Sequence, residues 1–309
     1  MIAFVFPGQG SQSVGMGKAF HDASPAARAV FEQANAALGF DLTRVMFQGP
    51  ETELALTANT QPAVLTASVA AAAACAERGL TPVLVGGHSL GEYSALVVAG
   101  ALALADAVRV VRKRGEFMQE AVPVGTGAMA AVMGLALDAV EAVCREAAQG
   151  QVVEVANVNS AAQIVIGGHK PAVERAVALA GERGGKKSVL LPVSAPFHCA
   201  LMKPAADRLA AELDRVTVRD PRIPVVRNVD GSLTRAASDV VPLLLSQVAS
   251  PVRWTDCVQR LAAEGATTFV EVGPGRVLTA LGKRIVEGAK AFAVEDPASL
   301  DKALAGPKA

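Results

Sequence analysis

One serine stands between two glycines, at the point where an apolar run gives way to a helical pattern. The stretch is Gly87-His88-Ser89-Leu90-Gly91, with apolar residues 82–85 before it and a predicted helix over 92–105 after it. A Gly-x-Ser-x-Gly sequence at a strand-to-helix turn is typical of a nucleophile elbow, in which small neighbours permit a strained turn that exposes the hydroxyl. The helix N-terminus also directs free N–H groups at an attacked carbonyl. The simpler alternative is a tight glycine-rich connection without chemistry.

A serine nucleophile needs a general base, and the chain has four histidines. His21 falls in an amphipathic helical pattern and His169 follows two glycines at a predicted helix start, so both are expected to be structural. His88 adjoins Ser89, and consecutive residues entering a turn generally point apart. By elimination, His198 in the predicted loop 195–199 is the best base for Ser89.

The group that would orient His198 is not evident from the residues. In α/β-hydrolases an acid lies between the serine and the histidine along the chain. The acidic residues between positions 89 and 198 fall mostly in helical patterns, and none stands on an obvious strand-end loop. A backbone carbonyl can hold an imidazole instead of a carboxylate.

Arg114 is the candidate for binding an acidic substrate. It is predicted to end a helix that runs through a strongly apolar stretch. A guanidinium there suits a carboxylate, because its fork makes two parallel hydrogen bonds. The alternative is that Arg112-Lys113-Arg114 forms a solvated helix end whose charges interact with the helix dipole.

Composition limits the class of protein. The chain has 309 residues, of which 51% are hydrophobic and 19% charged, enough for a full-sized core and two lobes. Its formal net charge is zero, so no general attraction to nucleic acid or to an anionic membrane is expected. Four widely spaced cysteines indicate reduced thiols and no metal site. Without a signal-peptide pattern or a long apolar run, we expect a soluble cytoplasmic protein.

The order of predicted elements indicates an α/β fold in two parts. Residues 126–195 read as β-α-β-β-α-β, the ferredoxin-like arrangement, with the segment 157–160 as the loop between the two middle strands. We interpret this segment as a small domain inserted into a large domain formed by residues 1–125 and 196–309. In the large domain, strands alternate with helices, which predicts a parallel sheet. One of those helices is expected to begin at Pro62, since proline is favourable at a helix start.

Eight short motifs follow one another along the chain. In order they are Phe6-Pro-Gly-Gln-Gly-Ser-Gln12, Asn59-Thr-Gln-Pro-Ala63, Gly87-His-Ser-Leu-Gly-Glu-Tyr-Ser94, Arg114-Gly-x-Phe-Met-Gln119, Asn157-x-Asn-Ser160, Phe197-His-Cys-Ala-Leu-Met202, Pro251-Val-x-Trp254 and Glu271-Val-Gly-Pro-Gly275. With these motifs the chain resembles the malonyl-CoA:acyl-carrier-protein transacylases of bacterial fatty acid synthesis over essentially its whole length.

The resemblance implies a large lobe similar to an α/β-hydrolase, a ferredoxin-like small lobe and an active site between them. It assigns Ser89 as nucleophile, His198 as base and Arg114 as the partner of the malonyl carboxylate. Further assignments that it implies are the backbone N–H groups of Gln9 and Leu90 as the oxyanion hole, the backbone carbonyl of Gln247 as the group that orients His198, and Gln61, Asn159 and Phe197 as residues lining the site.

The implied activity is ping-pong transfer of a malonyl group from malonyl-CoA to the phosphopantetheine thiol of acyl carrier protein, through a malonyl-serine ester. The expected protein is a monomer without metal or cofactor, CoA being only the carrier of the substrate, and it binds neither nucleic acid nor membrane. The alternatives are a free-standing acyltransferase of a polyketide pathway, a serine thioesterase or esterase, and a non-enzymatic scaffold that docks carrier protein.

Overall fold

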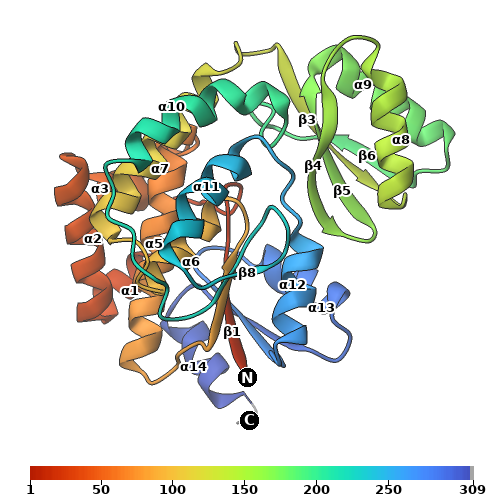
Figure 1. The fold of residues 1–309 in the computed structure, drawn as a ribbon. Helices are drawn as coiled ribbons and strands as arrows, with labels where there is room; N and C mark the ends of the chain where they lie inside the picture. The colour runs from red at the N-terminus through yellow and green to blue at the C-terminus, as the bar shows by residue number, and fades with distance from the viewer. Residues whose placement is uncertain (307–309) are drawn as a thin grey trace.

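Two β-sheets organise the chain, and Figure 1 shows them in separate parts of the molecule. The computed structural model describes residues 1–306. The six-stranded sheet has the order β10-β9-β1-β2-β7-β8 and the four-stranded sheet the order β4-β5-β3-β6. The predicted α/β class is confirmed.

The six-stranded sheet is parallel except at one edge. The strand β8 pairs antiparallel with β7, whereas the other neighbours run parallel. The strands are β1 (Ile2–Phe6), β2 (Leu84–Gly87), β7 (Val225–Val226), β8 (Leu233–Thr234), β9 (Thr268–Val272) and β10 (Lys290–Val294). Parallel pairing brings the carboxyl ends of β1, β2 and β9 to the same edge, where ligands bind in open α/β sheets.

Helices cover both faces of this sheet (Figure 1). Side chains of β1 alternate, so that Phe4 and Phe6 pack in a core with α5 (Thr57–Glu77), α6 (Leu90–Val98) and α7 (Leu104–Glu120). Ala3 and Val5 pack on the other face with α12 (Trp254–Ala263) and α13 (Val277–Ile285). A parallel sheet is stable only when both faces are buried in this way. The remaining helices outside the small sheet are α1 (Lys18–Ala23), α2 (Pro25–Leu38), α3 (Leu42–Gln48), α4 (Glu51–Leu54), η1 (Ala200–Met202), α10 (Lys203–Leu213), α11 (Ala237–Val248) and α14 (Pro297–Ala305).

The four-stranded sheet is antiparallel and has its own core against two helices. Its elements are β3 (Gly127–Met133), α8 (Leu137–Ala148), β4 (Val153–Ser160), β5 (Gln163–His169), α9 (Lys170–Glu182) and β6 (Lys187–Leu190). This order and pairing are those of the ferredoxin-like arrangement. All six elements fall within 126–195, although the exact domain boundaries stay a prediction.

The segment 157–160 is not the loop that the sequence predicts, because β4 continues to Ser160 with two register shifts. The strand also pairs on its outer edge with the large lobe. Val158 N–H donates to the carbonyl of Val252 over 2.9 Å, and Val252 N–H donates to the carbonyl of Ala156 over 2.9 Å. Backbone bonds to a distant segment therefore keep these polar residues in a strand.

The helix expected to begin at Pro62 begins earlier, at Thr57. Asn59 and Thr60 donate side-chain hydrogen bonds to the carbonyls of Glu53 and Leu54, at 2.9 and 2.6 Å. These contacts hold the first turn in place and make the polar segment helical. Pro62 therefore lies inside the helix, where it has no N–H to donate to the carbonyl of Ala58.

The predicted helix over 92–105 is divided, and Arg114 does not end a helix. The helix α6 stops at Val98, and Gly100, with φ of 76°, turns the chain toward α7. Arg114 lies inside α7, which runs on to Glu120, and it is only 2% exposed. The interpretation of Arg112-Lys113-Arg114 as a solvated helix end is therefore wrong for Arg114.

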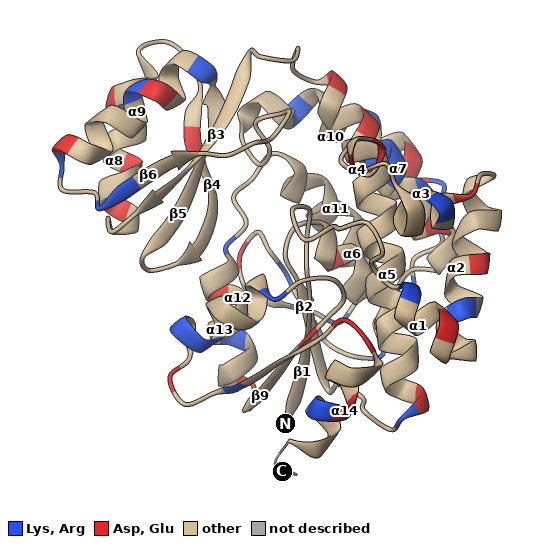
Figure 2. Cartoon of the chain, turned by 180° about the vertical axis from the view of Figure 1, so that it is seen from behind, with Lys and Arg blue, Asp and Glu red and all other residues tan. Residues whose placement is uncertain are grey.

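Charged residues of both signs are interspersed along the outer helices α2, α7 and α9 (Figure 2). Many form pairs on one helix, such as Lys113 with Glu116 at 2.8 Å. None of the helices in residues 1–306 combines the length and apolar character that crossing a membrane requires.

Candidate active site

The serine lies at the junction of β2 and α6 in a strained backbone conformation. Ser89 has φ of 52° and ψ of −106°, which L-residues rarely adopt. Both flanking glycines are needed for close backbone approach. A Cβ at Gly87 would lie 1.9 Å from the carbonyl carbon of Gly91, and one at Gly91 would lie 2.1 Å from the carbonyl oxygen of Phe6. The turn has the geometry of a nucleophile elbow.

His198 and Gln247 complete a hydrogen-bonded chain with this serine. The Ser89 Oγ lies 2.7 Å from His198 Nε2, and His198 Nδ1 lies 2.9 Å from the backbone carbonyl oxygen of Gln247. A carbonyl only accepts, so Nδ1 carries the proton and Nε2 is free to accept the serine hydroxyl. Here a carbonyl occupies the position that an acid has in the Ser-His-Asp triad.

His198 is neutral over a wide pH range. Burial, and next the positive charge of Arg114, lower the pKa of His198 from 6.5 to about 3. The imidazole is 4% exposed, so the charged form would lose its hydration. A neutral imidazole whose Nε2 is directed at Ser89 can take the hydroxyl proton directly.

The lowered pKa of His198 predicts that kcat/KM stays nearly constant as the pH falls below 7. A base with the ordinary pKa of 6.5 would lose about tenfold of kcat/KM at pH 5.5, because kcat/KM reports the free enzyme. We expect instead a change below about twofold between pH 7 and 5.5, since His198 protonates only at lower pH. The measurement is the release of CoA in a single turnover from malonyl-CoA, the substrate that the resemblance in sequence implies. An acidic limb with an apparent pKa near 6.5 would contradict the prediction.

Arg114 lies beside the nucleophile and is held by neutral groups. Its Nη1 donates to Gln61 Oε1 over 2.8 Å, and its Nη2 donates to Ser89 Oγ over 3.1 Å and to Gln247 Oε1 over 3.0 Å. Burial lowers the pKa of Arg114, yet a guanidinium remains protonated in proteins. Within residues 1–306 no carboxylate forms an ion pair with it. The buried cation therefore attracts an anionic group of a ligand.

A cavity of about 530 Å³ opens over these groups. Its wall includes Ser89, His198 and Arg114, together with the predicted residues Gln9, Gln61, Leu90 and Phe197. Asn159 is not on this wall, which contains Asn157 instead. Asn159 Oδ1 lies 2.9 Å from Nε2 of His88, so it meets the site only through a neighbour of the serine. In a regular strand Asn157 and Asn159 would share a face, because they are two residues apart. The register shift between Val158 and Ser160 breaks this alternation.

The comparison with known proteins decides the family. The family model described as acyl transferase domain matches residues 3–300. The chain belongs to the acyl transferase domain family. It is 52% identical to the malonyl CoA-acyl carrier protein transacylase of Escherichia coli (strain K12), over 98% of each chain. The resemblance found in the sequence motifs is confirmed.

Solved structures agree with this membership. An acyl carrier protein S-malonyltransferase from Vibrio cholerae O1 superposes with a TM-score of 0.95 at 48% identity, covering 98% of this chain and 99% of that one. A malonyl-transacylase in complex with a type II polyketide synthase acyl-carrier protein gives a TM-score of 0.96 at 48% identity, covering 99% of both.

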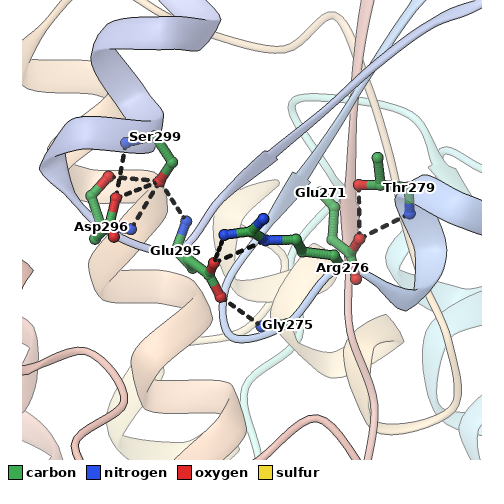
Figure 3. A network of polar contacts seen from close by, with 7 residues as sticks. All are labelled: Glu271, Gly275, Arg276, Thr279, Glu295, Asp296 and Ser299. Carbon is green, nitrogen blue, oxygen red and sulfur yellow. Dashed lines mark hydrogen bonds and ion pairs between the residues drawn. The ribbon is translucent and has the colours of Figure 1, made fainter.

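The loop that carries Gln9 in this acyl transferase is braced from the carboxyl end of β9. Gly273 and Gly275 pack against Pro7 and Ser11. A polar network holds this glycine loop (Figure 3). The buried Glu271 carboxylate accepts from the N–H groups of Leu278 and Thr279, at 3.1 and 2.7 Å. On the loop itself, Arg276 pairs with Glu295 at 2.6 Å, and the N–H of Gly275 donates to Glu295 over 3.3 Å. The backbone of the Gln9 loop is thereby fixed at the edge of the cavity.

The other three histidines have structural contacts. His88 packs on Trp254 with ring centroids 5.6 Å apart. His169 Nδ1 accepts from the N–H of Val152 at 3.0 Å, and the half-buried His21 packs edge-on against Phe31 and Phe47. No cluster of His, Cys, Asp or Glu in the described part of the chain has the arrangement of a metal site.

Two buried residues at the elbow were missed by sequence reasoning. Asn228 Oδ1 accepts from Ser89 N–H and its Nδ2 donates to the Gly87 carbonyl, each over 2.7 Å. Glu92 accepts from Asn228 N–H over 3.1 Å. The sequence contained a signal for each of them. Asn228 follows a predicted strand, and in a parallel sheet the carboxyl end of that strand lies at the same edge as the elbow. Glu92 is an acid inside an apolar helix.

Replacing Asn228 with alanine should destabilise the protein by about 2 to 6 kcal/mol, because the buried Gly87 carbonyl and the half-buried Ser89 N–H would each lose a partner at about 1–3 kcal/mol. Asn228 itself is fully buried. Urea denaturation gives the change in the free energy of unfolding. The matched control is Gln33→Ala, which removes an exposed amide from α2 and should stay within about 0.5 kcal/mol. Equal stability of both variants would refute the bracing role.

Proposed function

We propose that this acyl transferase moves a malonyl group from malonyl-CoA to the phosphopantetheine thiol of acyl carrier protein through a malonyl ester of Ser89. The observation that carries the proposal is the position of Arg114 Nη2, 3.1 Å from the Ser89 Oγ and on the wall of the same cavity. A malonyl carboxylate is separated from its thioester carbon by a single methylene, so its binding group must lie directly beside the nucleophile.

In the first half-reaction His198 Nε2 takes the proton of Ser89 as Oγ attacks the thioester carbonyl. The backbone N–H groups of Gln9 and Leu90 stabilise the developing oxyanion, and α6 adds the positive end of its dipole. The C–S bond then breaks and His198 returns the proton to the CoA thiolate. The phosphopantetheine thiol next attacks the malonyl-serine ester with His198 as base again, which restores the free hydroxyl.

Phe197 and Leu90 limit the space beside the malonyl methylene in this proposal. Phe197 is 8% exposed and both side chains line the cavity. An added α-methyl group would overlap these bulky residues, so methylmalonyl-CoA is expected to be a poor substrate.

The acceptor distinguishes a transferase from a thioesterase or esterase, which could use the same serine and histidine. With malonyl-CoA labelled in the malonyl group and with holo acyl carrier protein present, label should appear on the carrier protein much faster than as free malonate. The control contains apo carrier protein, which has no thiol arm. A release of malonate that is equally fast with holo and apo carrier protein would favour the hydrolase.

The second candidate is the same reaction in a polyketide pathway. It is supported by the similarity to the malonyl-transacylase solved with a type II polyketide synthase carrier protein. Similarity to the Escherichia coli protein supports the fatty-acid role. Comparing kcat/KM for carrier proteins of the two kinds tests which one this enzyme serves.

The proposed chemistry uses only this chain's own groups, so we propose an enzyme without a resident cofactor, CoA serving as the carrier of the substrate. A cytoplasmic location fits the four free cysteines, all of which are buried. The monomeric state stays a prediction.

A further inference from the structure

A buried carboxyl group lies behind Arg114, away from the cavity. Glu92 is 4% exposed and does not line the cavity, whereas Arg114 does. The side-chain amide of Gln247 joins them. Its Nε2 donates to Glu92 Oε2 over 2.7 Å, while its Oε1 accepts from Arg114 Nη2 over 3.0 Å. The acid and the guanidinium therefore face each other through one fully buried amide.

A buried guanidinium needs a compensating negative charge, because the cost of removing an unpaired ion from water is several kcal/mol. The direct partners of Arg114 are the neutral oxygens of Gln61, Ser89 and Gln247. Two acidic groups act on Arg114, first the phenol of Tyr93 and then Glu92, and of the two Glu92 is the carboxyl group. It is thus the counter-charge of the acyl site when no ligand carboxylate is present.

The surroundings of Glu92 allow it to exchange a proton near neutral pH. Burial raises the pKa of Glu92 to about 7, while Arg114 on α7 and Arg227 after β7 oppose this shift. The other titratable groups that face it are uncharged at pH 7, since burial raises the pKa of Tyr93 on α6 to about 12 and that of Cys257 on α12 well above 9. Among residues 1–306, the charges that act on this carboxyl group are those of Arg114 and Arg227, both positive, and Arg227 is itself paired with Asp230 at 2.6 Å.

The hydrogen bonds of Glu92 are compatible with both protonation states. The amide of Gln247 and the N–H of Asn228 both donate to the same oxygen, Oε2. A proton on Oε1 would leave both bonds in place. Glu92 can therefore change charge without rearranging the groups that position Ser89 and Arg114.

A malonyl carboxylate on Arg114 would bring a second anion to the same guanidinium. Two carboxylates that share one buried cation cannot both remain ionised without a large cost, and the more buried one takes up the proton. We propose that Glu92 is a positioning residue that acts as the exchangeable counter-charge of Arg114, partly ionised at neutral pH while the acyl site is empty and protonated when a malonyl carboxylate occupies it. This rests on the proposed function, because Arg114 must bind that carboxylate.

The proton can be counted by calorimetry. The Ser89→Ala variant would be titrated with malonyl-CoA at pH 7 in two buffers of different ionisation enthalpy, so that binding is measured without acyl transfer. CoA is the control ligand, because it has the same phosphates and adenine but no malonyl carboxylate. Glu92 is about half ionised at pH 7 in the empty site. Binding of malonyl-CoA should therefore be accompanied by the uptake of about half a proton more per protein molecule than binding of CoA. In the Ser89→Ala, Glu92→Gln double variant this excess should vanish.

The outcomes separate this inference from the proposed function. Tighter binding of malonyl-CoA than of CoA, with no excess uptake or with the same excess in the double variant, would overturn the role of Glu92 and leave that of Arg114 intact. Equal affinity for the two ligands would overturn both. If the double variant does not fold, the Ser89→Ala variant is titrated again at pH 5.5. Glu92 is already protonated at that pH, so the excess proton uptake with malonyl-CoA must disappear. An unchanged excess at pH 5.5 would overturn the inference.

Discussion

Replacing Ser89 with alanine should lower malonyl transfer to carrier protein by on the order of 10⁶-fold, the loss expected for a nucleophile that acts together with its base. His198→Ala should lose nearly as much, and the double variant should be no worse than the more impaired single variant. The reason is the direct Oγ–Nε2 contact of 2.7 Å, which makes the two side chains one catalytic unit. Steady-state transfer to holo acyl carrier protein measures all three variants.

The matched control for this series is Ser94→Ala on the same helix. Ser94 is fully buried, and its Oγ has no hydrogen-bond partner within the described residues. Removing that hydroxyl should therefore leave transfer within about twofold of the parent enzyme. Losses of Ser89→Ala and His198→Ala that multiply in the double variant would show that the two residues act independently, which contradicts the assigned roles.

Replacing Arg114 with alanine should lower kcat/KM for malonyl-CoA by about 10²- to 10⁴-fold, because the substrate carboxylate loses a buried partner worth about 3–5 kcal/mol. Acetyl-CoA has no carboxylate, so its transfer should change by less than about tenfold or even improve. The ratio of the two kcat/KM values is the informative quantity. It isolates the carboxylate contact from any general damage to the site.

Two variants control for the loss of a charged side chain. Arg112→Ala removes a neighbouring arginine of α7 that bonds Asn59 outside the cavity, and should keep the malonyl preference. Arg114→Lys keeps the charge without the fork and should recover only part of the preference. An equal loss of malonyl and acetyl transfer in Arg114→Ala would rule out Arg114 as the selector.

The nucleophile and the parallel sheet could be predicted because their signals are local. The close contacts at positions 87 and 91 require glycine at both, so the Gly-x-Ser-x-Gly spacing by itself indicates the tight turn. His198 followed by elimination, since His21 and His169 lie in segments with structural roles and His88 adjoins Ser89. Alternation of strands and helices then fixed the class of fold.

The surroundings of these residues could not be predicted from local patterns, because they depend on long-range packing. Arg112, Lys113 and Arg114 are adjacent in sequence, yet of the three only Arg114 lies on the face of α7 that is buried in the protein. Asn228 and Gln247 reach Ser89 from segments more than a hundred residues away. Asn157 lines the cavity and Asn159 does not because of register shifts in β4, and these shifts cannot be recognised from the residues of the strand.

Gln247 illustrates how one residue serves two roles through different atoms. Its backbone carbonyl orients His198, and its side chain links Arg114 to Glu92. The resemblance in sequence implied only the first role. Side-chain substitutions at this position would therefore test the charge network, while the carbonyl that orients the base stays in place.

The proposed mechanism requires that a malonyl group reside on Ser89. Mass spectrometry of the protein mixed with malonyl-CoA, followed by peptide mapping, should find one malonyl group on the peptide that contains Ser89, and holo acyl carrier protein should remove it. No adduct in the native protein, or an adduct that persists in Ser89→Ala, would contradict the account.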